Sequence, residues 1–184
     1  MIKDQDFELI NRFKEGDETA FNELVRKYQQ KIYWHARRMV GNHMDADEVT
    51  QEVLVVLYNK LDSFNFNSTF YTWLYRIVST RSLNSINRRK LKKFVFIDDE
   101  EARELKSNSD IAEDIDNKEK LEKLDNVLNK LPVKQREVFI LRHFDQLSYE
   151  EISNITGKSV GGLKANYFHA LKKVMELMDN ENKQ

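Results

Sequence analysis

Apolar residues recur every three or four positions along most of the chain, which is the spacing of amphipathic helices. The clearest run begins after Asp17, a residue that can cap a helix, and Gly41 lies beyond its end. The apolar positions of this run are Phe21, Leu24, Val25, Tyr28 and Ile32. Further helices are expected over residues 4–14, 45–61 and 69–93. We therefore predict a first helical domain over residues 1–93.

The helical periodicity is lost over residues 94–117, which are acidic and rich in Ser and Asn. This composition is typical of a solvated linker. The next apolar run consists of Leu121, Leu124, Val127, Leu128 and Leu131. Pro132 can then start a helix over residues 133–144. The sequence thus predicts an all-α fold in which two small helical domains, residues 1–93 and 118–184, are joined by an acidic linker.

The end of the second domain has the pattern of a helix-turn-helix. Ser148 and Glu151 have the spacing of a capping box, and Ser159 can cap another helix just after Gly157. Two helix starts separated by a short turn are the arrangement that many DNA-binding proteins place in the major groove. We expect the two helices to be held together by Ile152, Ile155, Leu163, Phe168 and Leu171.

Composition supports a helical protein and excludes several classes. The 184 residues include one Pro, five Gly and no Cys, so a disulfide framework and a thiolate metal site are excluded. The N-terminus lacks the basic flank and apolar stretch of a signal sequence, and no apolar run is long enough to span a membrane. We therefore expect a cytoplasmic protein with no membrane insertion of its own.

The formal net charge of -1 hides a segregation of charge along the chain. Residues 31–94 carry 11 Lys and Arg against 5 Asp and Glu, whereas residues 95–126 carry 5 against 12. A basic domain followed by an acidic connector favours nucleic acid as a partner. Charge runs are also common on solvated helix faces, so this asymmetry alone is compatible with both interpretations.

Acidic and amide side chains crowd the start of the helix expected over residues 45–61. Asp45, Glu48 and Glu52 fall on one helical face. Complementation of the helix dipole accounts for Asp45 and Asp47 but not for the density through Glu52. A hard cation would need a second cluster of oxygen ligands, and none is placed to supply it. We expect a polar face for a basic protein partner, formed by Asp45, Asp47, Glu48, Gln51 and Glu52.

Six aromatic residues lie between positions 64 and 75, where a loop leads into a helix. Rings interleaved with amides are typical of single-stranded DNA binding, because unstacked bases stack on the rings. Trp73, Leu74 and Ile77 sit at helical spacing and are better explained as core. The functional interpretation is stronger for the loop residues, which include Phe64, Asn65, Phe66 and Asn67.

Basic residues follow on the same helix. Arg81, Asn84, Arg88 and Lys92 fall within a narrow arc, which suits contact with a phosphate backbone. The basic run at residues 90–93 is equally explained as a partner for the helix C-terminus.

No catalytic residue and no cofactor is predicted. The four His residues show no metal-ligand spacing, and the chain has no glycine-rich phosphate loop and no Ser-His-Asp or Cys-His pairing. The His residues are better explained as surface or helix-packing residues, namely His35, His43, His143 and His169.

Taken in order, these parts resemble the extracytoplasmic-function sigma factors of bacterial RNA polymerase, within the sigma-70 superfamily. Residues 45–53 read Asp-Ala-Asp-Glu-Val-Thr-Gln-Glu-Val, and residues 72–77 read Thr-Trp-Leu-Tyr-Arg-Ile. Residues 131–139 read Leu-Pro-Val-Lys-Gln-Arg-Glu-Val-Phe and lead into the helix-turn-helix. Each motif alone is moderately specific, whereas the set in this order is highly specific. The resemblance covers residues 21–174.

The resemblance implies an initiation factor without catalytic activity of its own, whose partners are core RNA polymerase and promoter DNA. The acidic face of residues 45–52 would dock on the clamp helices of the largest polymerase subunit. The loop and the helix after it would capture flipped bases of the minus-10 element. The residues implied for this role are Asn65, Phe66, Asn67, Ser68, Arg76, Arg81, Asn84 and Arg88.

The resemblance also implies that the helix-turn-helix, near the polymerase flap region, reads the minus-35 element. The residues implied are Ser159, Val160, Gly161, Gly162, Lys164, Asn166 and His169. Family members often carry Thr-Val-Lys-Ser-Arg here, whereas residues 162–166 read Gly-Leu-Lys-Ala-Asn, which removes an Arg that could contact phosphate or guanine. An anti-sigma factor is a further partner that the family implies.

Two other functions account for parts of the same sequence. A stand-alone helix-turn-helix regulator would bind duplex DNA tightly without polymerase, as a dimer on a two-fold site. A nucleic-acid enzyme built on the acidic helix would show metal-dependent turnover, and the missing second ligand cluster argues against it.

Overall fold

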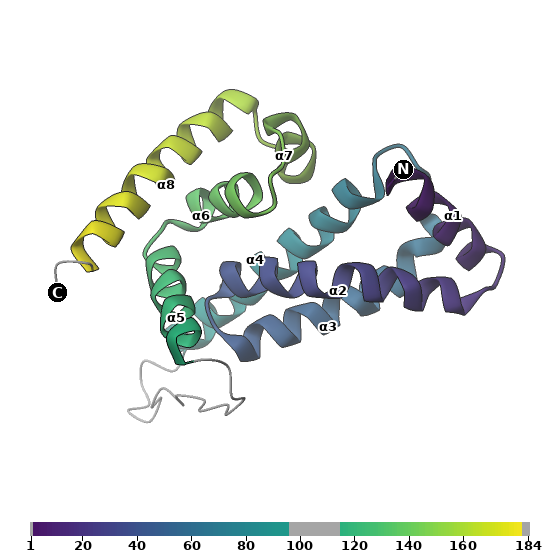
Figure 1. Cartoon of the computed structure of the whole chain (residues 1–184), viewed down its shortest axis with the longest axis horizontal. Helices are drawn as coiled ribbons and strands as arrows, with labels where there is room; N and C mark the ends of the chain where they lie inside the picture. Colours follow the sequence, from purple (N-terminus) through teal and green to yellow (C-terminus); the bar gives the residue numbers. More distant parts are fainter. Residues whose placement is uncertain (1, 96–114, 182–184) are drawn as a thin grey trace.

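The computed structural model describes residues 2–95 and 115–181, and all regular structure in these ranges is helical. This confirms the expected all-α fold (Figure 1). The N-terminal part contains α1 (Ile2–Lys14), α2 (Glu18–Val40), α3 (His43–Lys60), the 3-10 turn η1 (Leu61–Ser63) and α4 (Phe70–Val95). The C-terminal part contains α5 (Ile115–Asn129), α6 (Val133–Phe139), the π-helical turn η3 (Ile140–Phe144), α7 (Tyr149–Thr156) and α8 (Val160–Glu181).

Local signals set most helix ends where the sequence predicted them. The Asp17 carboxylate accepts a hydrogen bond from the backbone N–H of Thr19 at 2.9 Å, and Gly41 ends α2 in the left-handed region at φ 80°. Asn42 caps α3 through the N–H of Asp45, so α3 starts at His43, before the expected residue 45. Pro132 is the residue before the first turn of α6, rather than its first residue.

The expected linker at residues 94–117 is shorter than predicted at both edges. α4 continues to Val95 and α5 begins at Ile115. The rest of the predicted linker lies outside the described residues.

The N-terminal part is built around α2. Figure 1 shows α2 beside α3 and α4, with α1 crossing one end of the group. Buried side chains from all four helices form one apolar cluster, which includes Ile10, Leu24, Ile32, Val53 and Leu74. This packing leaves the outer faces of α3 and α4 and the loop between them available for binding.

The C-terminal part packs against the N-terminal part, with α5 and α6 next to α2 and α7 next to α4. The same apolar cluster continues into Val138, Leu141, Ile152 and Leu163. A smaller second cluster joins α5, α6 and α8 through Leu128, Leu131, Phe139 and Ala170. The two predicted domains therefore share a core in this structure.

Buried polar contacts also join the two parts. His35 of α2 lies with its Nδ1 2.7 Å from a carboxylate oxygen of Asp145, and both side chains are almost fully buried. The guanidinium of Arg136 donates to the backbone carbonyl of Met39 at 2.7 Å. Neither contact could be predicted from a local pattern, because the partners are about a hundred positions apart.

Candidate nucleic-acid interface

The loop between η1 and α4 displays one ring and buries another. Phe64 is 3% exposed, whereas Phe66 is 36% exposed. Phe66 adopts φ 60°, a left-handed conformation that costs a non-glycine residue roughly 1–2 kcal/mol. Its ring lies 4.9 Å from the ring of Phe64 and 4.6 Å from that of Phe7 in α1. The cost of this backbone conformation is therefore offset by ring packing that fixes Phe66 at the surface.

The polar residues of the predicted loop are exposed, unlike Phe64, for which the sequence also favoured a functional interpretation. Asn65, Asn67 and Ser68 are all open to solvent. The side chain of Asn65 accepts a weak hydrogen bond from the N–H of Asn67 at 3.3 Å, which is a turn contact within the loop. The amide groups on both sides of Phe66 in the sequence are therefore open to solvent.

The aromatic residues at the start of α4 belong mainly to the core. Leu74 is fully buried, and Trp73 and Ile77 are partly buried against the main apolar cluster. The Trp73 ring lies 5.1 Å from that of Phe64, so it supports the loop from below. The expectation that these three residues are core is confirmed.

The acidic face of α3 pairs with the basic face of α4. Arg88 lies 2.8 Å from Glu52 and 3.4 Å from Glu48, and Arg89 lies 3.0 Å from Asp45. Hydrogen bonding to Glu52 raises the pKa of Arg88. These pairs are partly exposed, and such surface pairs are worth little each. The polymerase-docking and minus-10 residues implied by the resemblance are thus direct neighbours.

Other residues of the two faces differ in their surroundings. Asp47 pairs with His43 of its own helix at 3.1 Å, and Gln51 is exposed. Arg81 lies 3.9 Å from Glu52, at the limit of an ion pair, and Asn84 is exposed. Asp47 and Gln51 are consequently the positions where the acidic face can be changed without disturbing an α4 arginine.

Arg76 contacts the C-terminal part rather than a carboxylate. Its guanidinium donates a hydrogen bond to the backbone carbonyl of Asn154 in α7. Arg76 nevertheless remains exposed. In this arrangement the first helix of the helix-turn-helix borders the surface that the sequence assigned to the minus-10 element.

A pocket of about 330 Å³ lies between α2, α4 and the residues that follow η3. Arg38 lies over the Phe144 ring at 4.2 Å from its centroid, and burial lowers the pKa of this guanidinium. No sequence pattern predicted this pocket, although Lys31, Trp34 and Arg38 recur on one face of α2. Its lining comprises Gln30, Lys31, Trp34, Arg38, Tyr71, Tyr75, Phe144, Asp145 and Gln146.

The helix-turn-helix forms as its capping signals predicted. The N–H of Glu151 donates to the Ser148 hydroxyl at 3.2 Å, and the Glu151 carboxylate accepts from the N–H of Ser148 at 2.8 Å. Gly157 ends α7 at φ 71°, and the Ser159 hydroxyl accepts from the N–H of Gly162 at 3.3 Å. Lys158 in the turn also pairs with the buried Glu137 of α6.

The first turns of α8 face outward, which is where the sequence placed minus-35 recognition. Val160 and Asn166 are partly buried, and the other five residues implied for this role are exposed: Ser159, Gly161, Gly162, Lys164 and His169. The Asn166 amide donates to the carbonyl of Gly162 at 2.8 Å, so one of its donors is engaged within the helix. The Lys164 ammonium lies 5.7 Å from the centre of the Tyr149 ring.

One packing expectation was wrong. Phe168 does not hold the two helices together, because it is 64% exposed. Ile152, Ile155 and Leu163 do pack in the main cluster, and Leu171 packs against the second one. Phe168 lies on the outer side of α8. Its apolar side chain suggested a packing role, so its exposure could not be predicted from the sequence alone.

Two further features are absent from residues 2–95 and 115–181. No group of three or more His, Asp or Glu residues in these ranges could hold a metal ion. In the same ranges, no helix is both long and apolar enough to cross a membrane.

Comparison with known proteins assigns two segments of the chain to described families. Residues 24–92 match the family described as sigma-70 region 2, and residues 121–174 match sigma-70, region 4. The chain is 34% identical over 164 residues to the ECF RNA polymerase sigma factor SigW of Bacillus subtilis (strain 168), which covers 84% of this chain and 87% of that protein. It is 36% identical over 181 residues to the ECF RNA polymerase sigma-E factor of Escherichia coli (strain K12), covering 94% and 92%.

A solved structure shares the fold. The structure of CnrH in complex with the cytosolic domain of CnrY matches with a TM-score of 0.72 at 23% identity, over 96% of this chain and 98% of that one. The chain therefore belongs to the extracytoplasmic-function sigma factors. It is an alternative sigma factor, which binds core RNA polymerase and directs promoter-specific initiation of transcription.

Proposed function

We propose that this sigma factor divides promoter recognition between the loop at residues 64–69 and the start of α8. The loop and the exposed face of α4 receive single-stranded minus-10 DNA, and the first turns of α8 read the minus-35 duplex. The observation that carries this proposal is the exposed Phe66 ring, flanked by amides and followed by a basic helix face. Stacking of a base on such a ring is worth about 1–3 kcal/mol, which helps to offset the cost of melting.

The acidic face of α3 is proposed to dock on the clamp helices of the largest polymerase subunit. Its carboxylates already attract arginines of α4, which supports a preference for a basic partner. Docking would then compete with these internal pairs for Glu48 and Glu52. Release of Arg88 from Glu52 would leave its guanidinium available for DNA phosphates.

Three further parts of the proposal rest on the family. The protein has no catalytic activity of its own, and it acts in the cytoplasm, where RNA polymerase is found. An anti-sigma factor is proposed to hold it inactive. CnrH, which shares the fold, was solved with the cytosolic domain of CnrY.

The experiment is co-purification with core RNA polymerase, followed by sequencing of the transcripts that the complex initiates on genomic DNA. We expect a stable complex and start sites that share two spaced elements. Binding of duplex DNA without any polymerase complex would instead support a stand-alone regulator.

Docking through α3 is best tested with a variant that leaves the ion pairs of the α4 arginines intact. Asp47→Lys and Gln51→Lys meet this condition, whereas Glu52→Lys would also unpair Arg88. We expect the double variant to lose co-purification with polymerase. Unchanged polymerase binding would contradict docking through α3.

A further inference from the structure

Two side chains of α1 extend the aromatic surface of the 64–69 loop. Phe7 and Lys14 are seven positions apart and so share a face of the helix. The Phe7 ring lies 4.6 Å from the Phe66 ring, and the Lys14 ammonium lies 5.0 Å from the centre of the same ring. Phe7 is 51% exposed, which leaves much of its ring open to solvent. Neither residue lies within residues 24–92, which match sigma-70 region 2.

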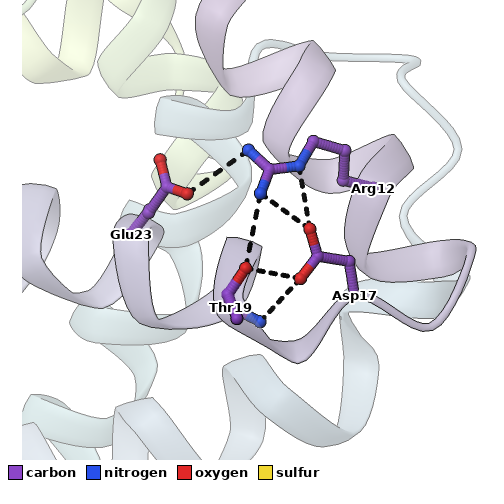
Figure 2. A network of polar contacts seen from close by, with 4 residues as sticks. All are labelled: Arg12, Asp17, Thr19 and Glu23. Atoms are coloured by element: carbon purple, nitrogen blue, oxygen red, sulfur yellow. Dashed lines mark hydrogen bonds and ion pairs between the residues drawn. The ribbon is translucent and has the colours of Figure 1, made fainter.

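α1 is held firmly at its C-terminal end. Figure 2 shows the guanidinium of Arg12 bonded to the Asp17 carboxylate and reaching Glu23 of α2. The Arg12 Nη2 and Asp17 Oδ2 atoms are 2.7 Å apart. The same carboxylate caps α2 through Thr19 (Figure 2). One carboxylate therefore fixes the end of α1 against the start of α2.

The N-terminal half of α1 is fixed as well. The Tyr28 hydroxyl donates to the buried carboxylate of Asp6 at 2.6 Å, and Lys27 pairs with the same carboxylate. Ile10 is fully buried in the main cluster. Phe7 is thus an exposed ring on a helix that cannot easily move, which is how a stacking platform is pre-organised.

Lys14 is partly engaged with the loop. Its ammonium donates to the carbonyl of Phe64 at 2.6 Å, and an ammonium has three donors. The charge therefore supports the loop while two donors are left for other acceptors. A phosphate beside a base stacked on Phe7 or Phe66 is the acceptor that such a site suits.

We propose that Phe7 is a base-stacking residue of the minus-10 surface and that Lys14 binds the adjoining phosphate. The proposal rests on the function proposed above, and it adds α1 to the elements that capture single-stranded DNA. The bound group is an unstacked base of the non-template strand together with its phosphate.

Three substitutions of Phe7 distinguish base stacking on its ring from a role limited to packing against Phe66. Phe7→Leu keeps an apolar contact with Phe66 but removes the ring, Phe7→Tyr keeps the ring, and Phe7→Ala removes both. Glu8→Ala, an exposed neighbour on α1, is the matched control. Thermal unfolding of each free variant identifies any loss of folding.

The measurement is the lifetime of heparin-resistant complexes of polymerase and full-length protein. It is made on a promoter found by transcript mapping, as a duplex and with the minus-10 region already unpaired. We expect Phe7→Leu to shorten the lifetime about 5- to 100-fold on both templates, with Phe7→Tyr close to wild type. Lifetimes for Phe7→Leu that match wild type, or equal losses for Leu and Tyr, would overturn the stacking role.

A second measurement does not depend on a variant that folds. Non-template strands carrying 5-iodouracil at each minus-10 position are irradiated in the wild-type complex, and the cross-linked tryptic peptide is identified. We expect cross-linking to the peptide of residues 4–12, which contains Phe7. Cross-links confined to the loop and α4 would overturn the proposal while supporting the proposed function, and a wild-type complex without promoter-specific starts would refute both.

Discussion

The 64–69 loop takes its shape from residues far away in the sequence, whereas the first turn of α7, where the helix-turn-helix begins, takes its shape from near neighbours. Lys14 binds a loop carbonyl 50 positions away, and the Phe66 ring rests on Phe7. The capping box of α7, by contrast, joins Ser148 to Glu151, three positions apart. A loop held by distant contacts should lose its shape when those contacts fail, and a locally capped turn should not.

The largest expected effect tests how much the contact between the C-terminal and N-terminal parts contributes to the free energy of unfolding. Arg136 of α6 donates to the carbonyls of Met39 and Asn129, at 2.7 and 2.9 Å. Burial lowers the pKa of this guanidinium to about 10. Arg136→Met would leave the buried Met39 carbonyl and the part-buried Asn129 carbonyl without this donor, so we expect a loss of about 2–3 kcal/mol in unfolding free energy. The measurement is urea unfolding at neutral pH.

The half-buried Arg142 has its contacts within the C-terminal part: it donates to the carbonyl of Leu147 and lies 5.3 Å from the centre of the Tyr149 ring. Arg142→Met is therefore the comparison variant. We expect it to lose less than half as much stability. Equal losses for the two variants would mean that contact between the two parts contributes little.

The next effect addresses the local support of the helix-turn-helix. Ser148→Ala with Glu151→Ala removes both halves of the capping box, and we expect a loss of about 1–2 kcal/mol. Glu150→Ala, in the same first turn, is the control, because Glu150 is exposed. Urea unfolding monitored by circular dichroism measures both. No difference between the double variant and the control would argue against a locally determined turn.

The third prediction concerns pH and the contact between α2 and α5. Asp125 lies 2.7 Å from Arg37, yet burial raises the pKa of its carboxyl to about 6, against the opposing effect of Arg37 and Arg38. Because this pKa is raised on folding, the protonated form favours the folded state. The stabilisation is complete below the pKa of the unfolded chain and is lost as the pH rises through about 6.

Asp125→Asn should remove this pH dependence. We expect wild type to lose about 1.4 kcal/mol relative to the variant between pH values of about 5 and 7.5. Urea unfolding at both pH values gives the difference, which cancels the titration of His residues common to the two proteins. A constant difference would show that the Asp125 pKa is not raised.

The same contrast explains which features could be predicted from the sequence. Caps at Asp17, Ser148 and Ser159 act within a few residues, so their sequence signals were sufficient. The His35 contact with Asp145 and the support of Phe66 by Phe7 join separate elements, and no local pattern encodes them. The exposure of an apolar residue such as Phe168 could not be predicted from the sequence either.

The acidic face of α3 and the basic face of α4 show a further limit of prediction from helical periodicity. Periodicity correctly grouped Glu48 and Glu52 on α3 and Arg81 and Arg88 on α4. It could not show that the two groups face each other, because that depends on how α3 packs against α4. The ion pairs between α3 and α4 were therefore not among the interpretations of these charges that the sequence supported.

The smallest expected effect concerns the glycines at the start of α8. A Cβ added at Gly161 would meet no atom within 4 Å, whereas one at Gly162 would lie 3.2 Å from the Ser159 hydroxyl oxygen that caps the helix. Ala favours a helix over Gly, so Gly161→Ala should stabilise the protein by about 0.5 kcal/mol, and Gly162→Ala by less. Thermal unfolding compares them.

These two variants also test how closely the helix backbone approaches DNA. If a phosphate binds the free N–H groups of this turn, the new methyl group at residue 161 should weaken minus-35 binding even as it stabilises the fold. Promoter binding by the polymerase complex is compared with and without the minus-35 element. Greater stability with unchanged binding would place the DNA contact further along α8, near Lys164, and would leave the local cap as the only role of this turn.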